Sequence, residues 1–205
     1  MKLFITGIGT DVGKTVVSAI VVEALEADYW KPIQSGDLDN SDTDKVKARV
    51  SNTKSIFHPN AYALQTPASP HYSAAIEGVT IDLNAIKEPK TKNHLVIEGA
   101  GGVFVPLNET DTIIDLIQPD YKVIVVSRHY LGSINHTLLT IEALKLRNIS
   151  IAGIIFSGDE NQATEHIILS KSSLPMLGRI ENEPYFDENV VSYYAEKFKD
   201  ALSNL

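Results

Sequence analysis

Residues 7–15 form a glycine-rich loop, Gly7-Ile8-Gly9-Thr10-Asp11-Val12-Gly13-Lys14-Thr15. Glycines let the backbone of such a loop pass close to phosphates, and the loop's N–H groups then point toward them. Lys14 is expected to reach the terminal phosphates, and the Thr15 hydroxyl to contact Mg²⁺. The stretch predicts a nucleoside triphosphate site whose loop contacts are Thr10, Asp11, Val12, Gly13, Lys14 and Thr15.

The glycine spacing of this loop departs from the usual pattern. A phosphate loop normally has a first glycine separated by four residues from the Gly-Lys-Thr triplet. Counting back from Gly13, that position holds Ile8, and glycines stand on either side of it, at Gly7 and Gly9. A strand-to-helix turn that merely uses glycine is therefore an alternative reading of the loop.

Short apolar runs alternate with amphipathic stretches on both sides of the loop, which is typical of a parallel sheet covered by helices. We expect a single domain, 1–205, with a doubly wound, mostly parallel sheet and helices on both faces, in a three-layer sandwich like that of P-loop NTPases. Residues 36–40 and 60–71 are expected to be irregular. The predicted strands are 2–6, 28–31, 95–98, 122–127, 149–156 and 176–180, and the predicted helices are 15–27, 43–50, 70–77, 112–118, 134–147, 163–171 and 189–202.

Composition excludes several classes of protein. The 205 residues include no cysteine, so disulfides and thiolate-ligated metal sites are ruled out. The net charge of −8, with no run of Lys or Arg, argues against a nucleic-acid-binding face and against adhesion to anionic membranes. No apolar run approaches the roughly 18 residues of a membrane helix. The apolar stretch before Gly7 is shorter than a signal peptide requires. We expect a cytoplasmic protein.

Three further residues are candidates for the same site because each follows a strand or a polar loop. Lys31 ends the second predicted strand and Glu98 ends the third, where ligands of doubly wound sheets bind. An acid at the end of a strand facing the loop is a common Mg²⁺ contact. Asp42, within Ser41-Asp42-Thr43-Asp44, opens a helix and could either cap it or contact the metal. Taken singly, Lys31 could be a solvated lysine and Glu98 part of a plain turn.

In combination, these motifs resemble one family closely, that of the ATP-dependent dethiobiotin synthetases. The family's loop also begins with a glycine at the position of Gly7, so the unusual spacing matches it. The similarity extends over nearly the whole chain. The matching segments are 7–15, Lys31-Pro32-Ile33-Gln34-Ser35-Gly36, Asn40-Ser41-Asp42, residues 66–71, Glu98-Gly99-Ala100-Gly101-Gly102, Val105-Pro106-Leu107 and Leu131-Gly132-Ser133-Ile134-Asn135-His136.

The resemblance implies a cyclo-ligase that forms C–N bonds in biotin biosynthesis. One amine of 7,8-diaminononanoate captures CO₂ as a carbamate, the carbamate takes the γ-phosphoryl group of ATP, and the second amine closes the ureido ring. It implies ATP as co-substrate, Mg²⁺ as metal and a homodimer whose interface lies near the substrate. The implied residues are Lys31 and Lys14 for catalysis, the loop with Glu98, Gly99, Ala100 and Gly101 for the nucleotide, Thr10, Ser35, Gly132, Ile134 and Asn135 for the diamine, and Thr15, Asp42 and Glu98 for the metal.

Two places depart from the family pattern, and both concern the nucleotide base. Ser157 stands where the family usually has an adenine-contacting Asn, and Ile180-Glu181-Asn182 replaces an Ile-Pro-Trp-like segment. The sequence therefore leaves the base preference open, as it does the choice of Asp42 or Asp44 as metal contact. A MinD/ParA-like switch ATPase and a small-molecule kinase are the alternatives. The former carries an extra loop lysine where this chain has Gly9.

Overall fold

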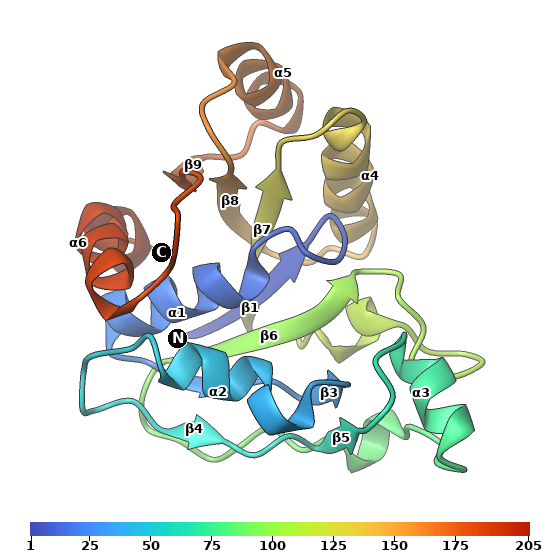
Figure 1. Cartoon of the computed structure of the whole chain (residues 1–205). Helices are drawn as coiled ribbons and strands as arrows, with labels where there is room; N and C mark the ends of the chain where they lie inside the picture. Colours follow the sequence, from blue (N-terminus) through green and yellow to red (C-terminus); the bar gives the residue numbers. More distant parts are fainter.

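The computed structural model describes all residues, 1–205, and is built around one parallel sheet (Figure 1). Its seven strands lie in the order β4-β2-β6-β1-β7-β8-β9, and every neighbouring pair is parallel. Two more strands, β3 (Ile33–Ser35) and β5 (Tyr62–Leu64), form a small parallel pair of their own. The strands of the main sheet are β1 (Lys2–Gly7), β2 (Asp28–Trp30), β4 (Phe57–His58), β6 (Leu95–Gly102), β7 (Tyr121–Arg128), β8 (Ile151–Ser157) and β9 (Met176–Ile180).

Helices cover both faces of this sheet, as the sequence predicts for a doubly wound fold. Figure 1 shows α1 and α6 together on one side and α4 and α5 on the other. None of the helices is both long and apolar enough to cross a membrane. The helices are α1 (Lys14–Leu25), α2 (Asp42–Lys47), α3 (Pro70–Ile76), α4 (Ser133–Leu146), α5 (Gln162–Ser172) and α6 (Glu188–Ser203).

The core is divided by the sheet because successive side chains of a strand point to opposite faces. On β1, Leu3 and Ile5 pack into the cluster that contains the buried residues of α1 and α6. Phe4, between them, packs into the other cluster with residues of α4 and α5. The β-branched residues that leave the propensity of 15–27 ambiguous, such as Val17 and Ile20, are fully buried, so tertiary packing settles this segment as helix.

Several predicted elements differ in extent from the observed ones. Residues 112–118 form only a short 3₁₀ turn, Ile113–Leu116, which Thr112 and Asp115 close by a capping box. The predicted strand 95–98 continues as β6 to Gly102, and the predicted helix 43–50 is the shorter α2. The sequence pattern does not predict β3, β4 and β5, nor the 3₁₀ turns Leu38–Asn40 and Leu83–Ala85. These strands have two or three residues each, too few for a periodic pattern.

The strand order places the candidate site. From β1 the chain crosses to β2 on one side, and after β6 it crosses to β7 on the other side of β1. The crevice at such a reversal, beyond the carboxyl ends of the strands, is where ligands bind in open α/β sheets. The loop between β1 and α1 and the ends of β2 and β6 all open into it.

Candidate active site

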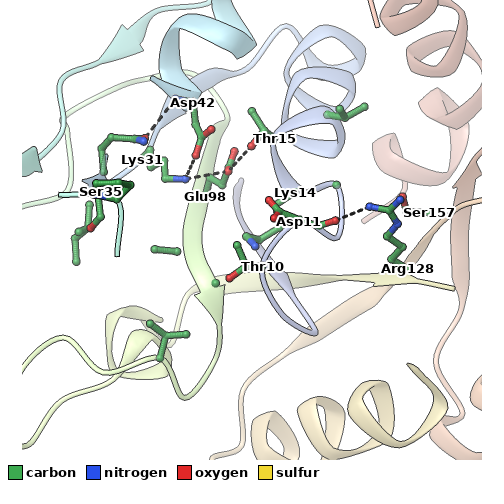
Figure 2. A pocket seen from close by; sticks show the side chains of 18 of the residues that line it. Thr10, Asp11, Lys14, Thr15, Lys31, Ser35, Asp42, Glu98, Arg128 and Ser157 are labelled. Carbon is green, nitrogen blue, oxygen red and sulfur yellow. Dashed lines mark hydrogen bonds and ion pairs between the residues drawn. The ribbon is translucent and has the colours of Figure 1, made fainter. Parts of the chain in front are cut away.

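A cavity of about 840 Å³ lies at the carboxyl ends of the central strands. Figure 2 shows side chains that line it, from the β1–α1 loop, the start of α1, the chain just after β2, β3, the start of α2, the middle of β6 and the ends of β7 and β8. Of the residues predicted from sequence, the cavity is lined by Thr10, Asp11, Gly13, Lys14, Thr15, Lys31, Ser35, Asp42, Glu98, Ala100 and Gly101.

The phosphate loop has a shape that depends on its glycines. A Cβ at Gly7 would lie 2.5 Å from Val12 Cγ2, so the loop can fold over its own buried valine only with glycine there. Gly13 is the N-cap of α1, and its φ of 99° lies in the left-handed region. Because glycine has no side chain, the first N–H groups of the helix are free of a side-chain cap. Free N–H groups at a helix start form a ready site for phosphate.

Lys14 is buried at the base of the cavity, and its Nζ donates to the carbonyl oxygen of Gly9 at 2.8 Å. Burial lowers the pKa of Lys14 to about 8, although the nearby Glu98 opposes that effect. A cation held in a dry position with its charge poorly compensated is suited to receive an anionic ligand.

Glu98 is the centre of a hydrogen-bond cluster. The side chain is 1% exposed, and Thr15 Oγ1 donates to its Oε1 at 2.9 Å. Lys31 Nζ donates to the same oxygen at 3.2 Å, while Tyr29 OH donates to Oε2 at 2.9 Å. Burial, together with the charge of Glu98, raises the pKa of Tyr29 well above its usual range, so the phenol keeps its proton. Three donors from two segments of the chain, the start of α1 and the β2 region, thus converge on one carboxylate of β6.

Lys31 joins Glu98 to Asp42, and Figure 2 shows both contacts as dashed lines. Burial alone would lower the pKa of Lys31, but Glu98 and Asp42 outweigh it and raise that pKa above the ordinary lysine value. Burial would raise the pKa of Asp42, but the charge and hydrogen bond of Lys31 lower it. Both groups are therefore charged near neutral pH.

The start of α2 shows which residue caps the helix and which acid faces the cavity, two roles that the sequence left open for residues 41–44. Ser41 is the N-cap, and it forms a capping box with Asp44, whose side chain accepts from the Ser41 N–H at 2.9 Å. Asp42 is thereby left to point at Lys31 and to line the cavity, whereas Asp44 does not line it. Of the two acids, Asp42 is the one in position to contact a metal.

Ser35 is the last residue of β3. Its Oγ is buried and has no hydrogen-bond partner in the protein, yet the residue lines the cavity. Opposite stands the segment Pro67–Pro70, which approaches so closely that a Cβ on Gly36 would lie 2.5 Å from Pro67 Cα. An unsatisfied hydroxyl on a cavity wall is suited to bind a polar ligand group.

The side-chain oxygens of Glu98 and its neighbours fit Mg²⁺ bound together with a nucleotide. No group of three or more His, Cys, Asp or Glu side chains stands ready to hold a metal alone. Mg²⁺ commonly takes one or two carboxylates and completes its shell with waters and phosphate oxygens. Thr15, Asp42 and Glu98 supply one hydroxyl and two carboxylates, which suits that mode of binding.

Five residues predicted as contacts do not line this cavity. Val12 is 3% exposed and belongs to the core, where it supports the loop. A Cβ at Gly99 would meet the Phe4 ring at 3.1 Å, so this glycine faces the opposite core cluster. The remaining three, Gly132, Ile134 and Asn135, lie at the exposed start of α4, outside the cavity of a single copy.

Two neighbours of the site, Tyr29 and Arg128, were not predicted from the sequence. Arg128 ends β7, lines the cavity and donates from Nη1 to the carbonyl oxygen of Asp11 at 2.9 Å, as Figure 2 shows. Its position at a strand end was a usable signal, as it was for Lys31. Tyr29 offered none, because a buried tyrosine in a strand is ordinary core.

The end of the cavity beyond the phosphate loop has an acidic lining. It is formed by Ser157 at the end of β8 and by residues 180–183 together with Phe186. Asn182 is held by Asp159, which accepts from its backbone N–H at 3.2 Å and from its side-chain amide at 3.0 Å. The departures from the family pattern at Ser157 and residues 180–182 therefore meet at one end of the cavity.

Comparison with known proteins identifies the family. A family model described as an AAA domain matches residues 1–190. The ATP-dependent dethiobiotin synthetase BioD of Christiangramia forsetii is 62% identical over 98% of both chains. The enzymes of the same name from Cytophaga hutchinsonii and Chlamydia pneumoniae are 52% and 41% identical, over 97% and 99% of this chain and 97% and 91% of their own.

Solved structures resemble the chain in fold. The septum site-determining protein MinD of Pyrococcus horikoshii, complexed with Mg-ADP, superimposes with a TM-score of 0.60 at 16% identity, over 98% of this chain and 90% of its own. The cell division ATPase MinD of Pyrococcus furiosus gives 0.61 at 14% identity, over 97% and 98%. These likenesses confirm the doubly wound fold and carry nothing about activity. The sequence identities reach much further, and by them the chain belongs to the family of ATP-dependent dethiobiotin synthetases, which are cyclo-ligases.

Proposed function

We propose that this protein carboxylates 7,8-diaminononanoate and closes the ureido ring of dethiobiotin, with ATP as the phosphoryl donor. The observation that carries the proposal is the convergence of Lys31, Glu98, Asp42 and Thr15 beside the phosphate loop. A site that only bound nucleotide would need Lys14 and the loop amides. A second, paired lysine in the same cavity as the unpartnered Ser35 hydroxyl is suited to a second anionic reactant.

The reaction requires two anions to meet. One amine of the diamine adds to CO₂ and loses a proton to give a carbamate. A carbamate oxygen then attacks the γ-phosphorus and expels ADP, and the second amine attacks the carbamoyl carbon, expels phosphate and loses a proton. Lys31 and Lys14 neutralise the approach of carbamate to phosphate, an electrostatic role typically worth several kcal/mol of barrier. Ring closure is intramolecular, so holding the diamine in place supplies much of the remaining rate.

Mg²⁺ is the metal we propose for the site, with Thr15, Asp42 and Glu98 as its protein contacts. When bound, the ion neutralises phosphate charge. The chain's own residues would do the rest: Thr10 to Thr15 would hold the phosphates with Ala100 and Gly101 beside them, and Lys31 would supply a second cation for the reacting carbamate. For the nucleotide, the loop contacts and Glu98 remain proposals that the cavity lining supports.

The diamine is proposed to lie between Ser35 and the phosphate loop. The unpartnered Ser35 Oγ and the exposed Thr10 can accept or donate to an amine or carbamate. The carboxylate end of the substrate would reach the N-terminus of α4, at Gly132, Ile134 and Asn135 of a second copy, because these residues lie outside the cavity of one copy. We therefore propose a homodimer that acts on small molecules in the cytoplasm, without nucleic acid.

Neither alternative is favoured by a specific observation. The structural likeness to MinD and ParA proteins is at 16% identity or less and shows the fold alone. This chain also has Gly9 where those ATPases carry their extra loop lysine. A kinase would leave the phosphoryl group on its product, whereas the proposed ligase releases inorganic phosphate.

The decisive experiment incubates the protein with diamine, bicarbonate, Mg²⁺ and, in separate reactions, ATP, GTP, CTP and UTP. Dethiobiotin is measured by mass spectrometry, and phosphate release is measured in parallel. We expect dethiobiotin and phosphate in equal amounts with at least one nucleotide. A phosphorylated diamine would indicate the kinase, and no product with any of the four would refute the proposed function.

A further inference from the structure

We propose that Tyr29 is a positioning residue for the metal site, which holds one oxygen of Glu98 so that the other faces the cavity. The inference rests on the proposed function, in which Glu98 contacts Mg²⁺. Tyr29 is fully buried and its hydroxyl donates to Glu98 Oε2 at 2.9 Å. Tyr29 does not line the cavity and is not itself expected to touch substrate or metal.

The register of the sheet explains how Tyr29 reaches Glu98. Tyr29 on β2 lies beside Val96 on β6, two residues before Glu98. Residues two apart on a strand share a face, so the tyrosine side chain and the carboxylate point to the same side of the sheet. The next residue, Trp30, points to the other side and packs in the opposite core cluster. Within β2 itself, Tyr29 is the residue whose side chain reaches the carboxylate, and Lys31 reaches it from just beyond the strand end.

The two oxygens of Glu98 have different neighbours. Oε1 accepts from Thr15 and Lys31, which both line the cavity, whereas Oε2 accepts from Tyr29 alone. The terminal torsion of a glutamate is broad, so packing alone does not fix its carboxylate plane. The tyrosine proton fixes it, because a carboxylate that is 1% exposed cannot exchange that donor for water.

Loss of the hydroxyl would affect metal binding through Lys31 as well. With Oε2 unpaired, the buried carboxylate would turn toward the one cation among its remaining donors, Lys31 Nζ, which lies 3.2 Å from Oε1. A carboxylate drawn to the lysine is less available to a metal. We therefore expect a weaker link between nucleotide and Mg²⁺, while the loop contacts to the nucleotide stay intact.

The test is the Mg²⁺ dependence of nucleotide binding in Tyr29→Phe, measured by calorimetry with a non-hydrolysable imido analogue of ATP. Each protein is titrated with the analogue, once in the presence of Mg²⁺ and once in the presence of EDTA. The dissociation constant in EDTA divided by that in Mg²⁺ gives the metal enhancement of nucleotide binding. We expect the enhancement to fall about ten-fold in the variant, the range typical of lost supporting contacts to metal ligands. Affinity in EDTA should stay within about two-fold of wild type, since the loop is untouched.

Tyr121→Phe is the matched control. Tyr121 is also a buried strand tyrosine whose hydroxyl donates to a glutamate, Glu88 Oε2 at 2.6 Å, but it does not line the cavity. Its enhancement should equal that of wild type. A second variant, Tyr29→Met, fills similar volume without a hydroxyl and should show the same selective loss, so the test does not depend on one variant folding.

The outcomes separate this inference from the proposed function. An unchanged enhancement in both Tyr29 variants, or an equal loss of affinity with and without metal, would overturn the role of Tyr29. If wild type itself showed no Mg²⁺ enhancement, the proposed metal site would fail and the Tyr29 role with it. Dethiobiotin formation by the wild type tests the function independently of either result.

Discussion

Lys31 is held by two carboxylates, Asp42 and Glu98, that we also propose as metal contacts. In this arrangement the lysine and the metal use the same acids, so nucleotide binding with Mg²⁺ would release Lys31 toward the reactants. The lysine thus stabilises two buried or half-buried negative charges in the free protein and serves the reaction afterwards. At the scale of single residues, this sharing predicts that removing Lys31 lowers turnover but leaves nucleotide binding with Mg²⁺ intact.

We predict that Lys31→Ala lowers kcat/KM for dethiobiotin formation at least about 100-fold, the size of effect seen when one preorganised electrostatic contact to a transition state is lost. Nucleotide binding with Mg²⁺ should be kept or slightly strengthened, because Asp42 and Glu98 lose a competing cation. Steady-state rates and calorimetry measure the two quantities. Lys54→Ala, which removes an exposed lysine paired with Glu26, is the control. Near wild-type turnover in Lys31→Ala would show that the assignment is wrong.

Nucleotide binding should take up a proton at Lys14 in alkaline solution. The pKa of Lys14 in the free protein is about 8 because of burial, and phosphate oxygens would favour its charged form. At pH 8.5 the free lysine is mostly neutral, so binding takes up about 0.7 proton there and almost none at pH 6.5. Calorimetry of the imido analogue in buffers of different ionisation enthalpy measures this uptake. Lys14→Arg, which stays charged, should abolish it.

At the scale of elements, two glycines share a left-handed backbone conformation, but only one of them has a close neighbour that a side chain would meet. Gly36, after β3, has φ of 74° and lies against Pro67, whose Cα a Cβ would approach to 2.5 Å. Gly78, after α3, has φ of 66° but faces open space. Gly36 is therefore what lets the strand that carries Ser35 meet the Pro67–Pro70 segment across the proposed diamine passage.

We predict that Gly36→Ala costs about 3 kcal/mol of unfolding free energy, from left-handed strain plus overpacking, and raises KM for the diamine. Gly78→Ala should cost only about 1 kcal/mol, the strain alone, and leave KM unchanged. Urea denaturation and steady-state kinetics test both variants. Equal destabilisation by the two substitutions would mean that the contact with Pro67 is not restrictive.

The sequence was most informative where an element is long or continuously apolar. Residues 122–127, Lys-Val-Ile-Val-Val-Ser, lie within β7 because a buried parallel strand needs apolar residues on both faces. By contrast, β3 and β5 exist only because residues about 30 positions apart pair with each other, which no local pattern encodes. For the same reason the strand-end positions of Lys31 and Glu98 predicted that both residues lie in one crevice, but they predicted neither the Lys31–Glu98 nor the Tyr29–Glu98 hydrogen bond.

At the scale of the whole molecule, the strand order assembles the site from distant segments. Thr15 and Glu98, 83 positions apart, meet because β1 and β6 are neighbours in the sheet. β1 also contacts β7 on its other side, so the site is joined to both halves of the chain. The cavity therefore needs the complete central sheet, and only the substrate contacts expected at α4 lie beyond it.

The proposed homodimer can be tested by introducing a charged residue at one end of α4. Leu131, just before the helix, is fully exposed, and Leu146, at its other end, is 83% exposed. If the α4 start completes a partner's site, Leu131→Glu should yield monomers in sedimentation analysis and raise KM for the diamine about ten-fold or more, since one anchoring contact is worth roughly that much. Binding of the imido analogue should not change. Leu146→Glu introduces the same charge on the same helix, about 20 Å away along its axis, and should remain dimeric. A monomeric wild type with full activity would show that one copy holds the entire substrate.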